Sequence, residues 1–127
     1  MILIIDDNPK DIELTILALE ATGRGISVLT ATDGQSALAM LSNGHELPAL
    51  ILLDIKMPCM DGMEVLREIR ADERLRYLPV VVVTSSSLES DRTEAIAAGA
   101  NDYLEKPLTL GKFSKALDSI MRRWLPN

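Results

Sequence analysis

The sequence predicts an α/β protein with five strands and five helices, in which a doubly wound parallel sheet is covered by helices on both faces. Short runs rich in β-branched residues alternate with longer stretches of helical periodicity, and three of the runs are apolar at every position. Such continuous apolar runs are typical of strands buried on both faces of a parallel sheet. Because the chain has 127 residues, we expect a single domain over residues 1–127.

Five segments are expected to form the strands of this sheet. They cover residues 2–5, 26–29, 50–53, 80–83 and 102–105. The first, third and fourth contain only apolar side chains, as expected of strands buried on both faces of a parallel sheet. The last segment is the shortest apolar run, because only two of its four residues are apolar.

Helical periodicity fills the intervals between these strands. Asn8-Pro9 predicts a helix start, with the Asn side chain as cap and proline at the first helical position. Asp61 and Thr109 are expected to cap two strongly amphipathic helices, the second of which is the longest of all. Weaker patterns indicate helices over residues 35–41 and 90–98. The element order is therefore βα repeated five times, which implies right-handed crossovers.

Composition argues against several classes of function. The formal net charge is −6 and only 3% of the residues are aromatic, which disfavours direct binding of nucleic acid. The single histidine, His45, and the single cysteine, Cys59, cannot form a zinc cluster or an internal disulfide. No apolar run reaches the length of about 20 residues that a membrane helix needs. We expect a cytoplasmic protein with no membrane segment.

Polar side chains follow the strands where the strands end, and this edge of an open parallel sheet is where sites form. Asp6 and Asp7 follow the first strand, Asp54 the third, Thr84 the fourth and Lys106 the fifth. Each alone has an ordinary alternative, as a turn, loop, strand or solvated residue. Together, three carboxylates at one edge would raise one another's pKa values unless a cation joined them. Oxygen ligands favour Mg²⁺ or Mn²⁺.

Four segments carry a resemblance to a known family over essentially the whole chain. They are Ile-Ile-Asp-Asp-Asn at 4–8, Leu-Asp-Ile-Lys-Met-Pro-Cys-Met-Asp-Gly at 53–62, Val-Thr followed by serines from 83, and Gly-Ala-Asn-Asp-Tyr-Leu-Glu-Lys-Pro at 99–107. In this order they resemble a bacterial response-regulator receiver domain of the chemotaxis-regulator type. The resemblance implies a flavodoxin-like fold with sheet order 2-1-3-4-5. Residues 8–15 also resemble small stand-alone regulators partnered with phytochrome-type kinases.

The resemblance implies a role for each site residue. Asp54 is expected to accept a phosphoryl group from a sensor histidine kinase or a histidine phosphotransfer protein, in a Mg²⁺-dependent reaction for which Mn²⁺ can substitute. The implied metal ligands are Asp6, Asp7, Asp54 and the backbone carbonyl of Lys56, and the implied phosphoryl ligands are Thr84 and Lys106. Such a protein is not a conventional enzyme, although it catalyses its own aspartyl phosphorylation and slow dephosphorylation. Lys56 occupies a variable position expected to influence that dephosphorylation.

The same resemblance implies a switch and an output surface. Thr84 and Tyr103 are expected to move together when Asp54 is phosphorylated; the alternative is a partly buried tyrosine with no switching role. A cis peptide is expected between Lys106 and Pro107, with a trans turn as the alternative. Because the chain ends at Asn127, we expect signalling by contact with a downstream protein target.

A homodimer is a further expectation from the resemblance. Its interface would use the face built from Ser90–Ala98, Tyr103 and the final helix. Met121, Trp124 and Leu125 would extend an apolar patch on that face, with ordinary packing of the last helical turns as the alternative.

Two rival functions use related chemistry. A hydrolytic aspartyl-phosphate enzyme would resemble Asp-x-Asp, but Lys56 stands where its second acid would protonate the leaving group. A flavin or nucleotide binder on the same sheet needs a glycine- or hydroxyl-rich loop after the first strand. Here that loop reads Asp6-Asp7-Asn8-Pro9, and it would repel a phosphate in the absence of metal.

Overall fold

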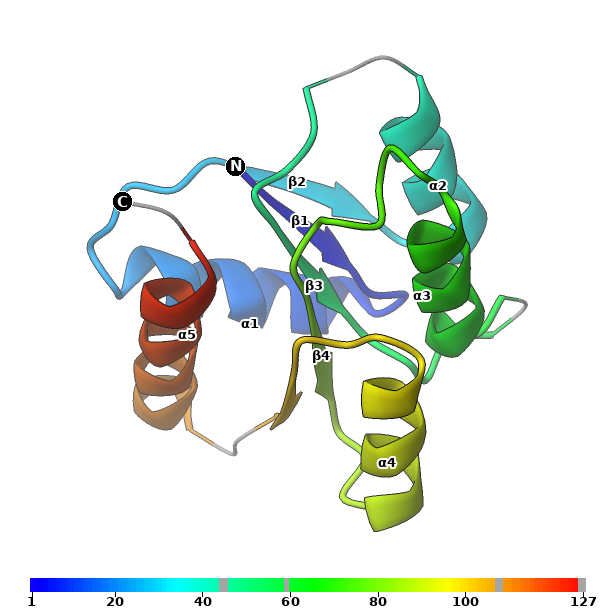
Figure 1. Ribbon diagram of the computed structural model, residues 1–127. Coiled ribbons are helices and arrows are strands. Elements are labelled where there is room, and N and C mark those ends of the chain that lie inside the picture. The colour runs from blue at the N-terminus through cyan, green and yellow to red at the C-terminus, as the bar shows by residue number, and fades with distance from the viewer. Residues whose placement is uncertain (44–45, 59, 107–108, 126–127) are drawn as a thin grey trace.

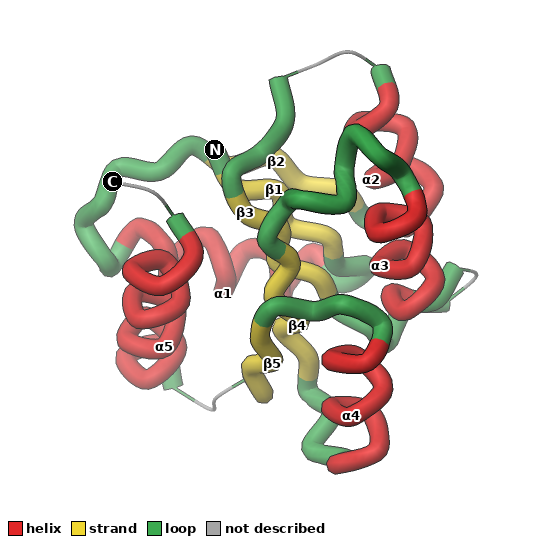
Figure 2. Tube along the Cα trace, viewed as in Figure 1, coloured by secondary structure: helices red, strands yellow, loops and turns green. Residues whose placement is uncertain are grey.

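The computed structural model describes residues 1–43, 46–58, 60–106 and 109–125, which form five strands and five helices (Figures 1 and 2). In chain order they are β1 (Ile2–Ile5), α1 (Pro9–Glu20), β2 (Val28–Ala31), α2 (Gly34–Ser42), β3 (Leu50–Leu53), α3 (Gly62–Ala71), β4 (Val80–Thr84), α4 (Glu89–Ala97), β5 (Asp102–Glu105) and α5 (Leu110–Trp124). Strands and helices alternate without exception among these residues, which confirms the predicted α/β class. No helix in the described ranges is long and apolar enough to cross a membrane.

All neighbouring strands of the sheet are parallel, in the order β2-β1-β3-β4-β5. This confirms the predicted flavodoxin-like topology. Helices α1 and α5 lie on one face of the sheet, whereas α2, α3 and α4 lie on the other (Figure 1). In the central pair of strands, Ile5 of β1 is in register with Leu53 of β3. The residues that follow them, Asp6 and Asp54, therefore leave the sheet side by side.

The hydrophobic core consists of two layers, one on each face of the sheet. Leu3 and Ile5 of β1 pack into the layer under α2 and α3, while the alternate residues Ile2 and Ile4 pack into the layer under α1 and α5. All four side chains are at most 2% exposed. The continuous apolar pattern of the strand is thus explained by burial on both faces.

The predicted helix starts are confirmed by their caps. The side chain of Asn8 accepts a hydrogen bond from the N–H of Lys10 at 3.0 Å. Asp61 accepts from Met63 at 2.8 Å at the start of α3, and Thr109 likewise caps α5. Each cap satisfies one of the N–H groups that a helix start leaves without an intrahelical partner.

The second strand lies two residues further along the chain than predicted. β2 covers Val28–Ala31 rather than residues 26–29. It is an edge strand whose Leu29 and Thr30 are exposed, so it lacks the continuous burial that defines the central strands. Ile26 packs against the core from the preceding loop. Its apolar side chain was therefore wrongly interpreted as part of the strand.

The expected apolar patch at the end of α5 is wrong for Met121. Its side chain is 1% exposed and belongs to the core layer under α1 and α5. Trp124 and Leu125 are half-buried and pack against the same layer. The indole N–H of Trp124 also donates to Asp102 at 3.4 Å. The stripe of α5 is explained by packing into the core layer between the sheet, α1 and α5.

Arg70 of α3 joins the connection that precedes β4 to the turn that precedes β5. Its guanidinium donates to the backbone oxygens of Gly99 at 2.9 Å and Leu78 at 2.8 Å, and to the side chain of Asn101 at 2.8 Å. Gly99 has φ +110° at the turn from α4 to β5. A Cβ placed there would lie 2.9 Å from the Arg70 side chain, so glycine is required both by the backbone and by the space.

We predict that Gly99→Ala lowers the free energy of unfolding by about 1 to 3 kcal/mol, because alanine is strained at positive φ and would displace Arg70. Gly111→Ala is the matched control. Gly111 lies in α5, and a Cβ placed there would have no neighbouring atom within 4 Å. That change should stabilise the protein by about 0.5 to 1 kcal/mol. Urea unfolding measures both values, and equal effects of the two changes would contradict the assignment.

Candidate functional site

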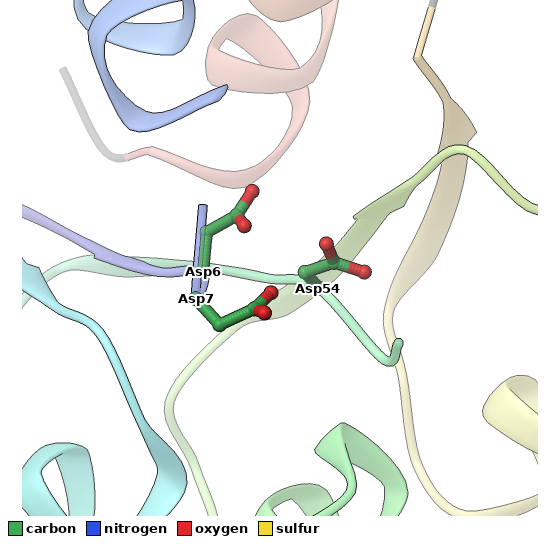
Figure 3. A group of neighbouring side chains, drawn as sticks. All are labelled: Asp6, Asp7 and Asp54. Atoms are coloured by element: carbon green, nitrogen blue, oxygen red, sulfur yellow. The ribbon is translucent and has the colours of Figure 1, made fainter. Parts of the chain in front are cut away.

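Three carboxylates meet at the carboxyl edge of the sheet. Asp6 and Asp7 follow β1, Asp54 follows β3, and one oxygen of each lies within 4.8 Å of the others. Figure 3 shows the three side chains lying beside one another at these strand ends. Asp6 and Asp54 are only 3% and 7% exposed, and Asp7 is half-buried. The sequence prediction that these residues converge is confirmed.

Lys106 brings an ammonium group to this cluster from the end of β5. Its Nζ lies 2.9 Å from Asp6 Oδ2 and 3.3 Å from Asp54 Oδ2. The backbone N–H of Lys106 donates to the carbonyl of Thr84 at 2.8 Å, one step beyond the last paired residues of β4 and β5. Sheet pairing therefore positions the lysine, although 100 residues separate it from Asp6.

Asp11 is a member of the site that the sequence analysis missed. Its Oδ2 accepts a hydrogen bond from Lys106 Nζ at 2.9 Å. Asp11 lies in the first turn of α1, and this helix begins at the same edge of the sheet, directly after Asp6 and Asp7. An acidic residue one turn into a helix that starts at the site was the available signal. This signal is not specific, because first-turn acids are also common for the helix dipole alone.

The electrostatics of the cluster follow from burial. Burial raises the pKa of Asp6, and the effect is only partly offset by the backbone N–H of Asn8, which donates at 3.0 Å, and by Lys106. For Lys106, burial alone would lower the pKa. Hydrogen bonds to Asp6 and Asp11 and the nearby charge of Asp54 outweigh burial and raise the pKa well above its ordinary value. Lys106 is therefore charged at neutral pH and compensates part of the acidic cluster.

The loop after Asp54 is held close to the site by its own backbone. The N–H of Lys56 donates to Asp54 Oδ1 at 2.9 Å, which fixes the carboxylate. Gly62, at the start of α3, lies so near this loop that a Cβ would be 2.3 Å from the Asp54 carbonyl oxygen. The close approach of α3 to the segment that carries Asp54 therefore requires glycine at position 62.

A second network lies beside the first, on the side of α4. The Tyr103 hydroxyl donates to the carbonyl of Ser86 at 3.0 Å, and its ring is 8% exposed. The N–H of Ser86 donates to the buried Thr84 hydroxyl oxygen at 3.4 Å. The Ser86 hydroxyl donates to Asp91 of α4, which also pairs with Lys56 Nζ at 3.0 Å. In the described structure, Thr84 and Tyr103 thus contact Ser86 rather than the carboxylates.

One expectation cannot be placed. The cis peptide between Lys106 and Pro107 lies outside the described residues.

The donor set fits a hard divalent cation. The ammonium of Lys106 is shared by the carboxylates of Asp6, Asp11 and Asp54. A further carboxylate, that of Asp7, lies beside those of Asp6 and Asp54. Carboxylate oxygens are the preferred ligands of Mg²⁺, which binds through few protein groups and keeps several waters. A cation between Asp6, Asp7 and Asp54 would supply the positive charge that Lys106 alone does not.

We predict that Asp6→Asn is more stable than the natural protein at pH 7 without divalent metal. A raised acid pKa contributes stability below the ordinary value of 3.8, and this contribution is lost as the pH rises through the folded-state pKa. The advantage of the variant should therefore shrink as the pH falls toward 3.8. Thermal unfolding in EDTA across this range measures it.

Asp33→Asn is the control, for which we expect the opposite pH dependence of stability. The N–H and hydroxyl of Ser36 lower the pKa of the exposed Asp33, so its stabilising contribution is present at neutral pH and is lost on acidification. A difference for Asp6→Asn that grew as the pH fell would contradict the burial of a carboxylate at this site.

Comparisons with known proteins agree with this geometry. Residues 2–118 match the family model described as the response regulator receiver domain. The chain is 36% identical over 129 residues to the probable methanogenesis regulatory protein FilR2 of Methanothrix harundinacea (strain 6Ac), a match that covers 98% of this chain and 83% of FilR2. Other curated relatives are longer, and the chain spans 28% or less of three of them.

Two solved structures are similar over nearly the whole chain. The phosphorylated cyanobacterial phytochrome response regulator RcpA is 35% identical, with a TM-score of 0.88 over 98% of this chain and 92% of its own. This confirms the expected similarity to phytochrome-partnered regulators. The receiver domain of the sensor histidine kinase PA1611 from Pseudomonas aeruginosa PAO1, with a magnesium ion coordinated in its active-site cleft, is 34% identical, with a TM-score of 0.79 over 97% and 94% of the two chains. The chain belongs to the response regulator receiver domain family of two-component signalling.

Proposed function

We propose that this receiver domain accepts a phosphoryl group on Asp54 from the phosphohistidine of a histidine kinase or a histidine phosphotransfer protein. The observation that carries the proposal is the position of Asp54. Its buried carboxylate lies within reach of two further carboxylates and of the Lys106 ammonium, at the edge where parallel sheets form their sites. The phosphorylated state of the similar regulator RcpA supports the same role.

The residues that would hold Mg²⁺, or Mn²⁺ in its place, are Asp6, Asp7, Asp54 and the backbone carbonyl of Lys56. Their support is the carboxylate cluster of this chain and the magnesium ion of the PA1611 receiver domain. When bound, the ion neutralises phosphoryl oxygens, so that an anionic nucleophile can approach them.

In the proposed step, an Asp54 carboxylate oxygen attacks the phosphorus of the phosphohistidine. The new O–P bond forms while the N–P bond breaks, and the histidine nitrogen keeps the electron pair. The N–H of Lys56 fixes the other Asp54 oxygen, which keeps the nucleophile in line. Lys106 and the Thr84 hydroxyl would then bind the phosphoryl oxygens by charge and by hydrogen bonding.

The output would follow from the second network. The Thr84 hydroxyl oxygen accepts from the Ser86 N–H, and the Ser86 carbonyl accepts from the hydroxyl of Tyr103. A shift of Thr84 would therefore be transmitted to Tyr103 and to α4 through the same serine. The face built from Ser90–Ala98, Tyr103 and α5 would present the change to a downstream protein or to a second copy of the chain.

We place this exchange in the cytoplasm. Histidine kinases form their phosphohistidine from ATP, and ATP is held on the cytoplasmic side. The net charge of −6 supports protein partners over direct contact with nucleic acid.

Phosphoryl acceptance predicts that acetyl phosphate with Mg²⁺ adds the mass of one phosphoryl group to the pure protein. EDTA and Asp54→Asn should each abolish the gain, because one removes the cation and the other removes the nucleophile. Intact mass spectrometry measures it. Asp33→Asn, an exposed acid elsewhere on the chain, is the matched control and should be phosphorylated normally.

Failure of the natural protein to gain mass, together with failure to bind beryllofluoride in the presence of Mg²⁺, would refute phosphoryl acceptance. The chain would then be a receiver-fold interaction domain that works without phosphorylation. Gain of mass in Asp54→Asn would instead move the acceptor to another residue.

Lys56→Asn should change the rate at which phosphate is released from Asp54. Its ammonium is held by Asp91 in the described structure, and the hydrogen bond to Asp91 raises the pKa of Lys56. Asp91→Asn would free the cation and should shift the rate in the opposite direction, each by up to about fivefold for a solvent-screened pair. Radiolabelled phosphate release measures both, and equal rates in all three proteins would remove the idea.

A further inference from the structure

Asp11 is distinguished from the other carboxylates around Lys106 by its place in the fold. It comes from α1, whereas Asp6 and Asp54 follow strands of the sheet. Its side chain is 35% exposed, compared with 12% for Lys106. Asp11 therefore approaches the ammonium from the solvent side, while the other two carboxylates approach it from the buried side.

The hydrogen bonds of Lys106 divide into two short ones and one longer one. An ammonium group has three donors, and they go to Asp6 at 2.9 Å, Asp11 at 2.9 Å and Asp54 at 3.3 Å. The longest bond reaches the carboxylate that would carry the phosphoryl group. That donor is the one that would turn to a phosphoryl oxygen, while the bonds to Asp6 and Asp11 hold the side chain.

Of these two holding carboxylates, only Asp11 has no other task in the proposed reaction. Asp6 is a proposed metal ligand, and a cation bound to it would weaken its attraction for the ammonium by competing for the same charge. The hydrogen bond that Lys106 donates to Asp11 would then be the one that no metal ion weakens. We infer that Asp11 is a positioning residue, which holds the Lys106 ammonium in place for the phosphoryl group.

This inference rests on the proposed function. It predicts whether removal of the Asp11 carboxylate weakens or tightens the binding of a phosphoryl mimic. If Asp11 acted only through its charge, its removal would lessen repulsion and tighten the binding of an anionic phosphoryl mimic. If Asp11 competed with the phosphoryl group for Lys106, its removal would also tighten binding. A positioning role predicts the reverse, because an unheld lysine must be ordered when the anion binds.

The test is the affinity of the full chain for beryllofluoride at saturating Mg²⁺, measured by calorimetry for the natural protein, Asp11→Asn and Asp11→Glu. We expect Asp11→Asn to bind about three- to tenfold more weakly, the scale of a charge-assisted hydrogen bond partly screened by solvent. Asp11→Glu keeps the charge and has room at its partly exposed site, so it should recover part of the affinity. Glu13→Gln is the matched control, since it removes one exposed negative charge from the same helix and should leave the affinity unchanged.

A spectroscopic signature separates positioning from a loss of stability. The ¹⁹F NMR resonance of the bound fluorine that faces Lys106 should shift in Asp11→Asn but not in Glu13→Gln. Thermal unfolding of each variant, measured in parallel, confirms that the compared proteins are folded.

The outcomes distinguish the two claims. Equal or tighter binding by Asp11→Asn, with normal binding by the natural protein, would overturn the role of Asp11 and leave phosphoryl acceptance intact. If the natural protein itself bound no beryllofluoride, the proposed function would fail, and the role of Asp11 would fail with it.

Discussion

The structure depends on one electrostatic constraint, which is the repulsion between carboxylates at one edge of the sheet. A parallel sheet brings the ends of its strands, and the acidic residues that follow them, to the same edge. The register of β1 with β3 places Asp6 beside Asp54, and both carboxylates are almost completely buried. Carboxylates in such a place cannot all stay ionised without cations. Lys106 supplies one positive charge through three hydrogen bonds, and the remaining negative charge is what makes the site suitable for a divalent metal.

The two hydrogen-bond networks of the site share a backbone link that connects chemistry to surface. The N–H of Lys106 donates to the carbonyl of Thr84, so the two residues that we propose as phosphoryl ligands lie at the ends of neighbouring strands. From Thr84 the contacts continue through Ser86 to Tyr103 and to Asp91 of α4. In the proposed function, these contacts are the path by which phosphorylation of Asp54 would reach α4.

Sequence reasoning succeeded where burial was uniform and failed where it was one-sided. The central strands followed from continuous apolar runs, since burial on both faces leaves no polar position, whereas their order followed from the resemblance to receiver domains. β2 was misplaced because this edge strand lacks continuous burial and because Ile26 packs against the core from a loop. The carboxylates and Lys106 were found because strand ends locate them, but Asp11 was missed because its contact with Lys106 depends on how α1 packs, which spacing alone does not encode. Met121 was misjudged for the same reason, as the exposed side of α5 is decided by the sheet beneath it.

The most direct test of this account is anomalous diffraction from a crystal of the protein soaked in Mn²⁺. The account predicts one strong anomalous peak among the carboxylates of Asp6, Asp7 and Asp54, lost in a crystal of Asp7→Asn soaked in the same way, with Lys106 still bonded to Asp11. A peak elsewhere on the acidic surface, or an unoccupied carboxylate cluster at saturating Mn²⁺, would contradict the claim that the charge excess at this sheet edge is compensated by a metal.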